Sequence, residues 1–280
     1  DRAIDTAIQT STRFPQTITR QGINANYAFA GKKSNLNVDA DFSRYKGRYS
    51  NEVLNTVQNE VSGLANALGV DIGLWSFRAD WSRQTAKGYK WEAGAKWVHT
   101  GNGSDLSSFV LNNKIWKQDS LLSVNFLFHE RIAATYGSVR HEGKKWSWQA
   151  GLRAEATSVK GKARNGVGAT DNRPDTSYIN LFPSLYVQYN VAKDHQLLMN
   201  LSRRIDRPTY NDQNPFMYSL DAFNMEQGNP YLRPQISYVA EAGYSYKGSA
   251  SLRLRATHTE GFIDQITYAF GNNTVMVPQN

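Results

Sequence analysis

The residues best able to do chemistry are the five histidines, and their spacing suits neither catalysis nor metal binding. They are His99, His129, His141, His195 and His258. Protein metal sites usually take two ligands from one short stretch, whereas each of these histidines stands alone in its segment. The chain also has no cysteine, which excludes thiolate ligands and disulfides. The sequence therefore predicts no metal site and no cofactor.

Other catalytic motifs are incomplete. Asp194 and His195 are adjacent, but they lie at a short turn, away from the long connections where a surface enzyme would place its acid and base. Gly166-Val167-Gly168 lacks the third glycine and the helix of a phosphate-binding loop, and no G-x-S-x-G occurs. We therefore predict that the protein is not an enzyme. The net charge of +8 comes from dispersed residues without a nucleic-acid-binding motif, so no nucleic acid is expected as a partner.

The element that organises the chain is a pair of alternating runs, Leu181 to Val191 and His195 to Arg204. In each run apolar and polar residues alternate, and only three residues separate the runs. When apolar residues recur at every second position on both sides of a short polar turn, the pattern predicts an antiparallel hairpin. Each run has about ten residues, the length at which a tilted strand crosses a bilayer.

Four other stretches repeat this hairpin pattern. They are residues 23–42, 70–100, 130–159 and 235–262. The connections between hairpins are long, at residues 45–69, 101–128, 160–178 and 205–234. In the first connection, the spacing of Val53, Val57, Val61 and Leu64 predicts a short amphipathic helix. In the second, residues 109–116 and 121–128 could extend the strands above the membrane.

Short turns that alternate with long connections are typical of membrane-spanning barrels. We predict an all-β fold, a transmembrane antiparallel up-and-down β-barrel of roughly ten strands plus a fragment. Residues 1–22 are assigned to a loop or to the end of a preceding strand. Residues 23–280 are assigned to a barrel segment that is incomplete at both ends. Its first strand and its last run from Ile266 must pair with chain outside the segment, with each other or with another copy of the chain. A soluble antiparallel β protein remains an alternative.

The alternation also predicts two faces. The outward face carries large apolar residues, for example Trp146, Trp148, Leu152, Leu197, Leu201, Leu252 and Leu254. The lumen receives Asp39, Asp41, Arg78, Asp80, Glu92 and Lys96, together with Arg153, Glu155, Arg204, Glu241, Arg253 and Arg255. Because both charge signs occur, we favour mutual pairing for most of these groups, with a ligand path as the other role.

The connection at residues 205–234 is the best candidate for ligand or partner contact. Aromatic residues stand there among asparagines and aspartates, a mixture common in binding loops. The candidate ligand-binding residues are Tyr210, Asn214, Phe216, Tyr218, Phe223 and Tyr231. The alternative is that these aromatic residues only pack the connection on itself.

Several motifs resemble the outer-membrane β-barrel domain of TonB-dependent receptor-like proteins. They are Gly151 to Glu155, Leu181-Phe182-Pro183-Ser184, Ser202 to Pro208, Asn214-Pro215-Phe216 and Gly228 to Pro234. The resemblance is strongest over residues 130–266, where all of these motifs lie. Gln235 departs from the pattern, which more often has glutamate after this proline.

The resemblance implies a barrel of about 22 strands in the outer membrane of a Gram-negative cell. It also implies a plug domain before the barrel, uptake of a small-molecule or peptide substrate, and a TonB-type complex that energises uptake through a segment not in this chain. Outer-membrane lipid and lipopolysaccharide would surround the barrel, and a surface-exposed protein is a further candidate partner. The rival hypothesis is a plugless barrel that anchors a surface or secretion assembly.

Overall fold

A computed structural model describes residues 8–57, 60–85, 88–165, 170–172, 175–220, 223–271 and 273–280. The long strands are β2 (Gln16–Ala30), β3 (Ser34–Val57), β4 (Glu60–Gln84), β5 (Tyr89–Asn112), β6 (Ile115–Glu142), β7 (Trp146–Asn165), β9 (Thr176–Ala192), β10 (His195–Asp206), β13 (Gln235–Tyr246) and β14 (Ala250–Glu260). The shorter elements are β1 (Ile8–Arg13), β8 (Thr170–Asn172), α1 (Tyr210–Gln213), β11 (Met217–Ser219), β12 (Asn224–Gln227), β15 (Asp264–Phe270) and β16 (Asn273–Gln279). The glycines at 166 and 168 lie outside the described residues.

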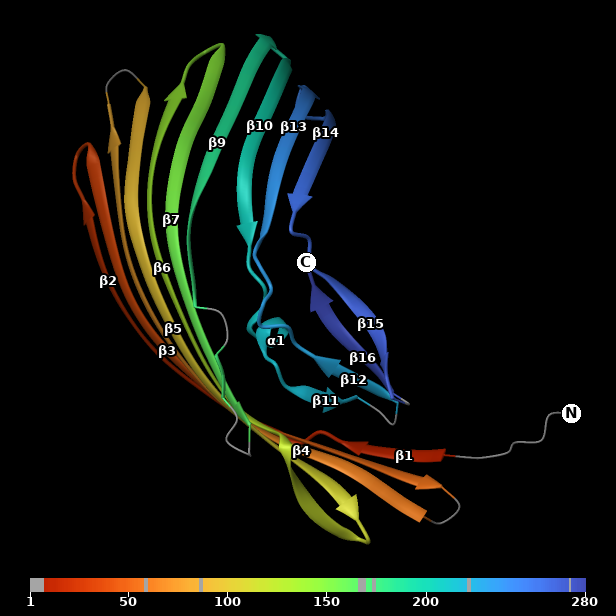
Figure 1. Cartoon of the computed structure of the whole chain (residues 1–280). Coiled ribbons are helices and arrows are strands. Elements are labelled where there is room, and N and C mark those ends of the chain that lie inside the picture. Colours follow the sequence, from red (N-terminus) through yellow and green to blue (C-terminus); the bar gives the residue numbers. More distant parts are fainter. Residues whose placement is uncertain are drawn as a thin grey trace, which may run out of the picture.

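The long strands form one curved antiparallel sheet (Figure 1). Its order is β2-β3-β4-β5-β6-β7-β9-β10-β13-β14, and β1 and β8 add to the edges of β3 and β7. We call this sheet the wall. Within the described residues, its outer strands β2 and β14 do not pair with each other, so the wall is open. The up-and-down antiparallel order confirms the predicted barrel fold. No described helix is both long and apolar enough to cross a membrane.

The predicted short turns are confirmed, and they lie together at one end of the wall (Figure 1). In the last of them Lys247 and Gly248 have φ angles of 52° and 69°. Tight hairpin turns use such positive φ values because they match the twist of the flanking strands. We call this end the turn end and the opposite end the loop end.

The helix predicted between residues 45 and 69 is wrong. β3 and β4 pair without interruption to the contact of Val57 with Glu60. A spacing of four residues is even, so Val53 and Val57 fit one face of a strand as well as one face of a helix. Val53 is 1% exposed in the resulting sheet. The next connection is likewise built of extended strands, because β5 and β6 pair as far as Asn112 and Ile115.

Both ends of the chain differ from the expected boundaries. β1 pairs with the loop-end half of β3, and β2 begins at Gln16 rather than at Ile23. Residues 16–22 have Ile18 as their one apolar side chain, so this part of the edge strand lacks the alternation that identifies Ile23 to Ala30. The run from Ile266 does not continue the wall. It turns back at Gly271, where φ is 61°, and β16 then pairs in parallel with β12.

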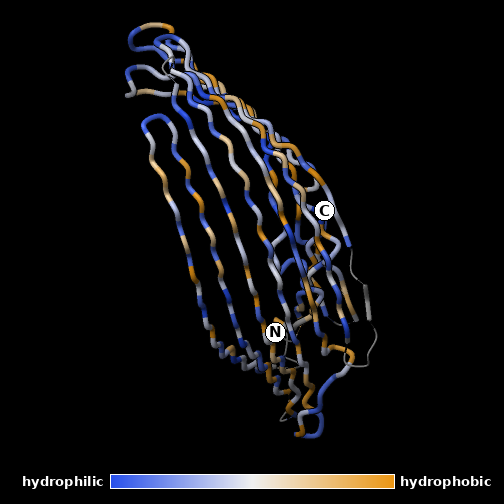
Figure 2. The backbone as a smooth tube through the Cα atoms, turned by 90° about the vertical axis from the view of Figure 1, so that its left-hand side faces the viewer, coloured by the Kyte–Doolittle hydropathy of each residue, from blue (hydrophilic) through white to orange (hydrophobic). Residues whose placement is uncertain are grey.

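The two faces of the wall differ in chemistry, and hydrophilic and hydrophobic residues alternate along the strands (Figure 2). α1, β11 and β12 lie on the concave side (Figure 1). The positions that face them include Ser104, Phe126 and Ala163, which are register partners on β5, β6 and β7. Residues two apart along each strand share this concave face, and the intervening residues lie on the convex face.

Candidate functional site

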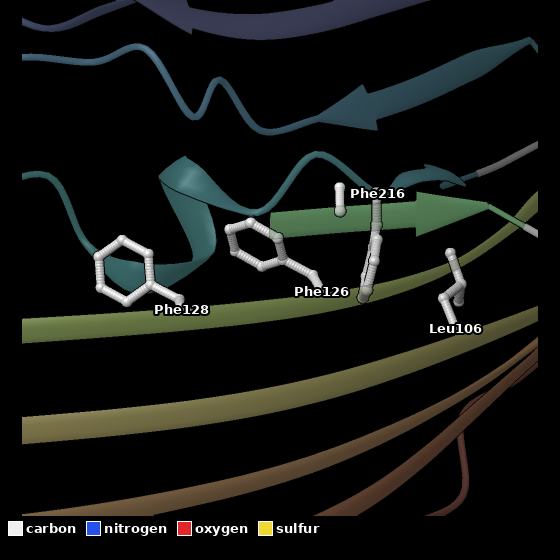
Figure 3. Packing of buried hydrophobic residues seen from close by; sticks show 5 residues of the cluster. Leu106, Phe126, Phe128 and Phe216 are labelled. Atoms are coloured by element: carbon white, nitrogen blue, oxygen red, sulfur yellow. The ribbon is translucent and has the colours of Figure 1, made fainter. Parts of the chain in front are cut away.

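The connection between β10 and β13 folds back into the concave side of the wall. We call residues 207–234 the inner segment. Its Phe216 is 1% exposed and joins a cluster with Leu106 of β5, Phe126 and Phe128 of β6, and Ala163 of β7 (Figure 3). The segment therefore shares a small hydrophobic core with three strands of the wall.

An ion cluster attaches the start of the inner segment to the wall. The guanidinium of Arg207 donates to Glu155 of β7, which is 6% exposed, and to the hydroxyl of Thr157 at 3.1 Å. Glu130 of β6 lies 3.7 Å from the same guanidinium. A buried carboxylate is stable only when it is paired, so Arg207 and Glu155 depend on each other.

Tyr210, three residues after Arg207, forms a second attachment. Its ring lies 5.7 Å from that of Phe128 and 6.2 Å from that of Phe126, and its hydroxyl is 2.8 Å from the hydroxyl of Ser104. Burial raises the pKa of Tyr210 to about 12, against an opposing effect of the hydrogen bond to Ser104. The ring is thus held in a site that disfavours the phenolate.

Tyr210→Phe should make attachment of the inner segment less dependent on alkaline pH. Because the attached state holds the phenol proton more tightly, its stability is complete below the ordinary pKa near 10 and falls as pH rises toward about 12. Limited proteolysis of the segment across this range measures the effect. Tyr231→Phe, an exposed site in the same segment, should keep the wild-type profile. Identical profiles for wild type and Tyr210→Phe would contradict the assignment.

Local hydrogen bonds explain the shape of the inner segment. Thr209 caps α1: its hydroxyl accepts from the amide of Asp212, whose carboxylate accepts from the amide of Thr209. Gly228 packs against the end of this helix, where an added Cβ would lie 2.2 Å from the carbonyl oxygen of Asn214. The side chain of Asn229 donates to the carbonyl of Pro278 at 3.1 Å. These motif residues therefore fold the segment compactly.

Gly228→Ala should destabilise the inner segment by about 1–3 kcal/mol, the usual cost of overpacking. Backbone oxygens surround the added methyl, so the whole turn would have to move. Gly69→Ala is the matched control, because its nearest neighbour would be 4.0 Å away. Thermal unfolding of both variants tests this expectation. A cost at position 228 no greater than at position 69 would show that the contact is not tight.

A cavity of about 620 Å³ lies between the inner segment and strands β2 to β5. It is lined by Phe14, Pro15, Gln16, Tyr45, Tyr49, Ser50, Asn51, Asn66, Leu68, Val70, Ile72, Leu106, Thr209, Tyr210, Asn211, Asn214 and Phe216. None of these side chains is charged. The hydroxyls of Tyr45 and Tyr49 contact each other. The cavity thus offers aromatic surfaces, amides and hydroxyls, the groups that bind neutral polar molecules.

The predicted ligand-binding residues divide into two groups. Tyr210, Asn214 and Phe216 line the cavity together. Phe223 and Tyr231 are 53% and 58% exposed and do not line it. The side chain of Tyr218 lies outside the described part of the structure.

The predicted polar lumen residues all occupy concave positions by register. Arg153 lies 3.6 Å from Glu155 and 4.6 Å from the ring centre of Phe182. Glu241 is the register partner of Arg255 on β14. Arg204 lies opposite Ser237, and Arg253 lies opposite Gly243. Glu155 binds the inner segment.

Arg207, Glu130, Tyr45 and Tyr49 were not among the predicted site residues. Arg207 stands beside a proline at the start of a connection, where a solvated arginine is the ordinary expectation. Tyr45 and Tyr49 fell in the stretch expected to be a connection. Strand alternation carried past residue 44 would have placed both tyrosines on the concave face.

Strand order, open concave wall and inner segment together define an outer-membrane-type β-barrel. Residues 27–280 match the model described as Outer membrane protein beta-barrel family. The chain belongs to this family and lies in the outer membrane. No curated protein sequence matches it.

Solved structures that are similar to this chain include two receptors and a transporter. The closed form of the ferric-catecholate import receptor Fiu from E. coli K12 has a TM-score of 0.59 at 10% identity, covering 94% of this chain and 43% of the receptor. The copper transporter OprC has a TM-score of 0.54 at 12% identity, covering 96% of this chain and 52% of the transporter. The ferric yersiniabactin uptake receptor FyuA from Yersinia pestis has a TM-score of 0.50 at 12% identity, covering 91% of this chain and 45% of the receptor. The chain spans about half the length of these proteins, and the likeness confirms the barrel fold of TonB-dependent receptors.

Proposed function

We propose that this chain is part of the barrel of a TonB-dependent outer-membrane receptor, whose cavity captures an uncharged ligand for uptake. The observation that carries the proposal is the cavity between the inner segment and the wall, which is lined without a charged side chain. A receptor must retain its ligand at the outer end of the barrel before passing it inward. A cavity formed jointly by wall and inner segment suits that step.

The remaining steps follow from the family. The ligand passes along the lumen beside polar groups such as Arg153, Glu241 and Arg255. A plug domain gates this path, and a TonB-type complex energises it through a segment outside this chain. No catalytic step is part of the proposal. The ferric complexes and copper named for the similar structures are cargo of those proteins.

The ligand class follows from the lining. A charged ligand that enters a cavity without a counter-charge loses hydration and gains no ion pair. Tyr45, Tyr49 and Tyr210 supply aromatic faces, while Asn66 and Asn211 supply amides that exchange hydrogen bonds with hydroxyl groups. We therefore propose a neutral, hydroxyl-rich ligand such as an oligosaccharide.

The test uses cells that produce the full-length protein, with tritiated neutral oligosaccharides and a ferric catecholate as probes. Val70→Trp projects a large ring into the cavity, whereas Val98→Trp adds the same ring elsewhere on the concave face. Uptake of the neutral probe should stop with a protonophore, fall at least about tenfold in Val70→Trp, and persist in Val98→Trp.

Each departure has a separate meaning. Uptake of the ferric catecholate alone would overturn the ligand class and leave transport standing. Uptake that ignores the protonophore would overturn TonB-dependent energising. No uptake of either probe, together with a protein partner that co-purifies stoichiometrically, would favour the scaffold function.

A further inference from the structure

The convex face carries a cluster of basic side chains at the loop end. The residues are Arg44, Lys46 and Arg48 on β3, Arg131 on β6, and Lys160, Lys162 and Arg164 on β7. All are exposed, whereas the intervening Tyr45 and Tyr49 on β3 and Ala163 on β7 are half-buried or buried on the concave side. We call this set the convex basic surface. A basic cluster on the face that meets lipid requires a physical reason, because hydrocarbon does not tolerate cations.

Register brings these residues into adjacent rows. One row runs from Arg44 across Gly73 and Gly101 to His129 and Lys160. Strands lie about 4.8 Å apart, so this row spans roughly 19 Å. An added Cβ at Gly73 would meet nothing within 4 Å. At Gly101 an added Cβ would lie 3.3 Å from the ring of His129, so this imidazole covers that position. The row is therefore bare backbone at Gly73, with cations at both ends.

An aromatic ladder borders the surface on its turn side. Phe42 lies 4.4 Å from Trp75 between ring centres, Phe77 lies 5.8 Å from Trp97, and Trp97 lies 6.0 Å from His99. In membrane barrels such aromatic belts mark the boundary between hydrocarbon and headgroups. The convex basic surface therefore lies at the headgroup level of the leaflet on the loop side, which is the outer leaflet.

Acidic residues neutralise only part of this charge. Asp71 lies 2.7 Å from Arg44 and 3.6 Å from Lys46, and Asp175 lies 3.1 Å from Lys160. In the part of the chain that the structure describes, Arg48, Arg131, Lys162 and Arg164 have no ion-pair partner, while Glu52 on β3 and Asp105 on β5 are two further convex acids. A surplus of exposed cations remains beside the aromatic ladder.

We propose that the convex basic surface binds the phosphate groups of lipopolysaccharide in the outer leaflet, with acyl chains against Phe42, Trp75 and Trp97. Guanidinium groups match phosphate oxygens with paired hydrogen bonds, and lysines add point charges. The bare backbone at Gly73 leaves room for part of a sugar-phosphate headgroup. This inference rests on outer-membrane location and is independent of uptake.

The test compares two triple variants of the full-length protein purified in detergent. Arg48→Gln/Arg131→Gln/Lys162→Gln removes cations that have no ion-pair partner, so folding should persist. Lys32→Gln/Lys144→Gln/Lys193→Gln removes the same charge at the turn end. We measure lipopolysaccharide retained per protein and its affinity at low and high salt. The first variant should bind at least about tenfold more weakly, the second should match wild type, and salt should weaken wild-type binding.

A second measurement keeps the test decisive if the first variant misfolds. Wild-type protein should bind phosphatase-treated lipopolysaccharide at least about tenfold more weakly than the intact lipid. Phosphatidylglycerol and inorganic phosphate should compete poorly. Equal binding of treated and intact lipid, equal loss in both triple variants, or full competition by phosphatidylglycerol or inorganic phosphate would each overturn the proposal.

Discussion

Arg207→Met is expected to cost about 3–5 kcal/mol and to release the inner segment from the wall. The variant leaves Glu155, at 6% exposure, as a buried carboxylate without its cation. The hydroxyl of Thr157 loses its donor at the same time. Because Arg207 lies only three residues before the start of α1, its loss frees the part of the segment that carries Tyr210 and Phe216 into the core. Urea unfolding in micelles and protease sensitivity of residues 207–234 measure both effects.

The matched control for this charge removal is Arg204→Met, three residues earlier at an exposed concave position. It should cost less than about 0.5 kcal/mol. The double variant Arg207→Met/Glu155→Leu should recover much of the loss, because an apolar pair leaves no orphaned charge. A single Arg207→Met as mild as the control, or a double variant worse than the single, would show that the ion pair does not hold the segment.

Leu254→Arg is expected to cost about 2–4 kcal/mol and to impair assembly into the outer membrane, whereas Arg255→Leu should assemble normally. Leu254 lies on the convex face of β14 and is 67% exposed, so it meets hydrocarbon in the membrane. Arg255 is its neighbour on the concave face, opposite Glu241. The two changes lie at the same depth and differ only in the face.

Assembly is measured by heat-modifiable migration of the protein from purified outer membranes, and stability by urea unfolding in lipid vesicles. Leu252→Arg, on the same face two residues closer to the turn end, should show a smaller cost because depth sets the penalty. If Arg255→Leu were the more damaging change, the assignment of faces would be reversed.

The wall could be predicted from the sequence because its signals are local. Alternation in the run His195 to Arg204 already defines which residues share a face, and the polar turns define where each hairpin reverses. The same alternation assigned Arg153, Glu155 and Arg255 to one face before any pairing was known. Local signals failed at Val53 and Val57, whose spacing of four fits helix and strand equally.

The position of the inner segment could not be predicted from the sequence. Its sequence indicates caps and turns, such as Thr209 with Asp212, but a turn pattern does not say on which side of a wall a connection lies. Its position depends on contacts with residues far away in the chain: Arg207 meets Glu155 across 52 residues, and Tyr210 meets Ser104 across 106.

The sequence by itself therefore determined the strands, the turns and the two faces, because hydrophobic period and turn chemistry act between near neighbours. Only the tertiary structure decided that residues 207–234 fold inward and enclose a cavity with Tyr45 and Tyr49. Burial of Phe216 and pairing of the Glu155 carboxylate favour that position, and both depend on curvature that brings distant strands to one concave surface.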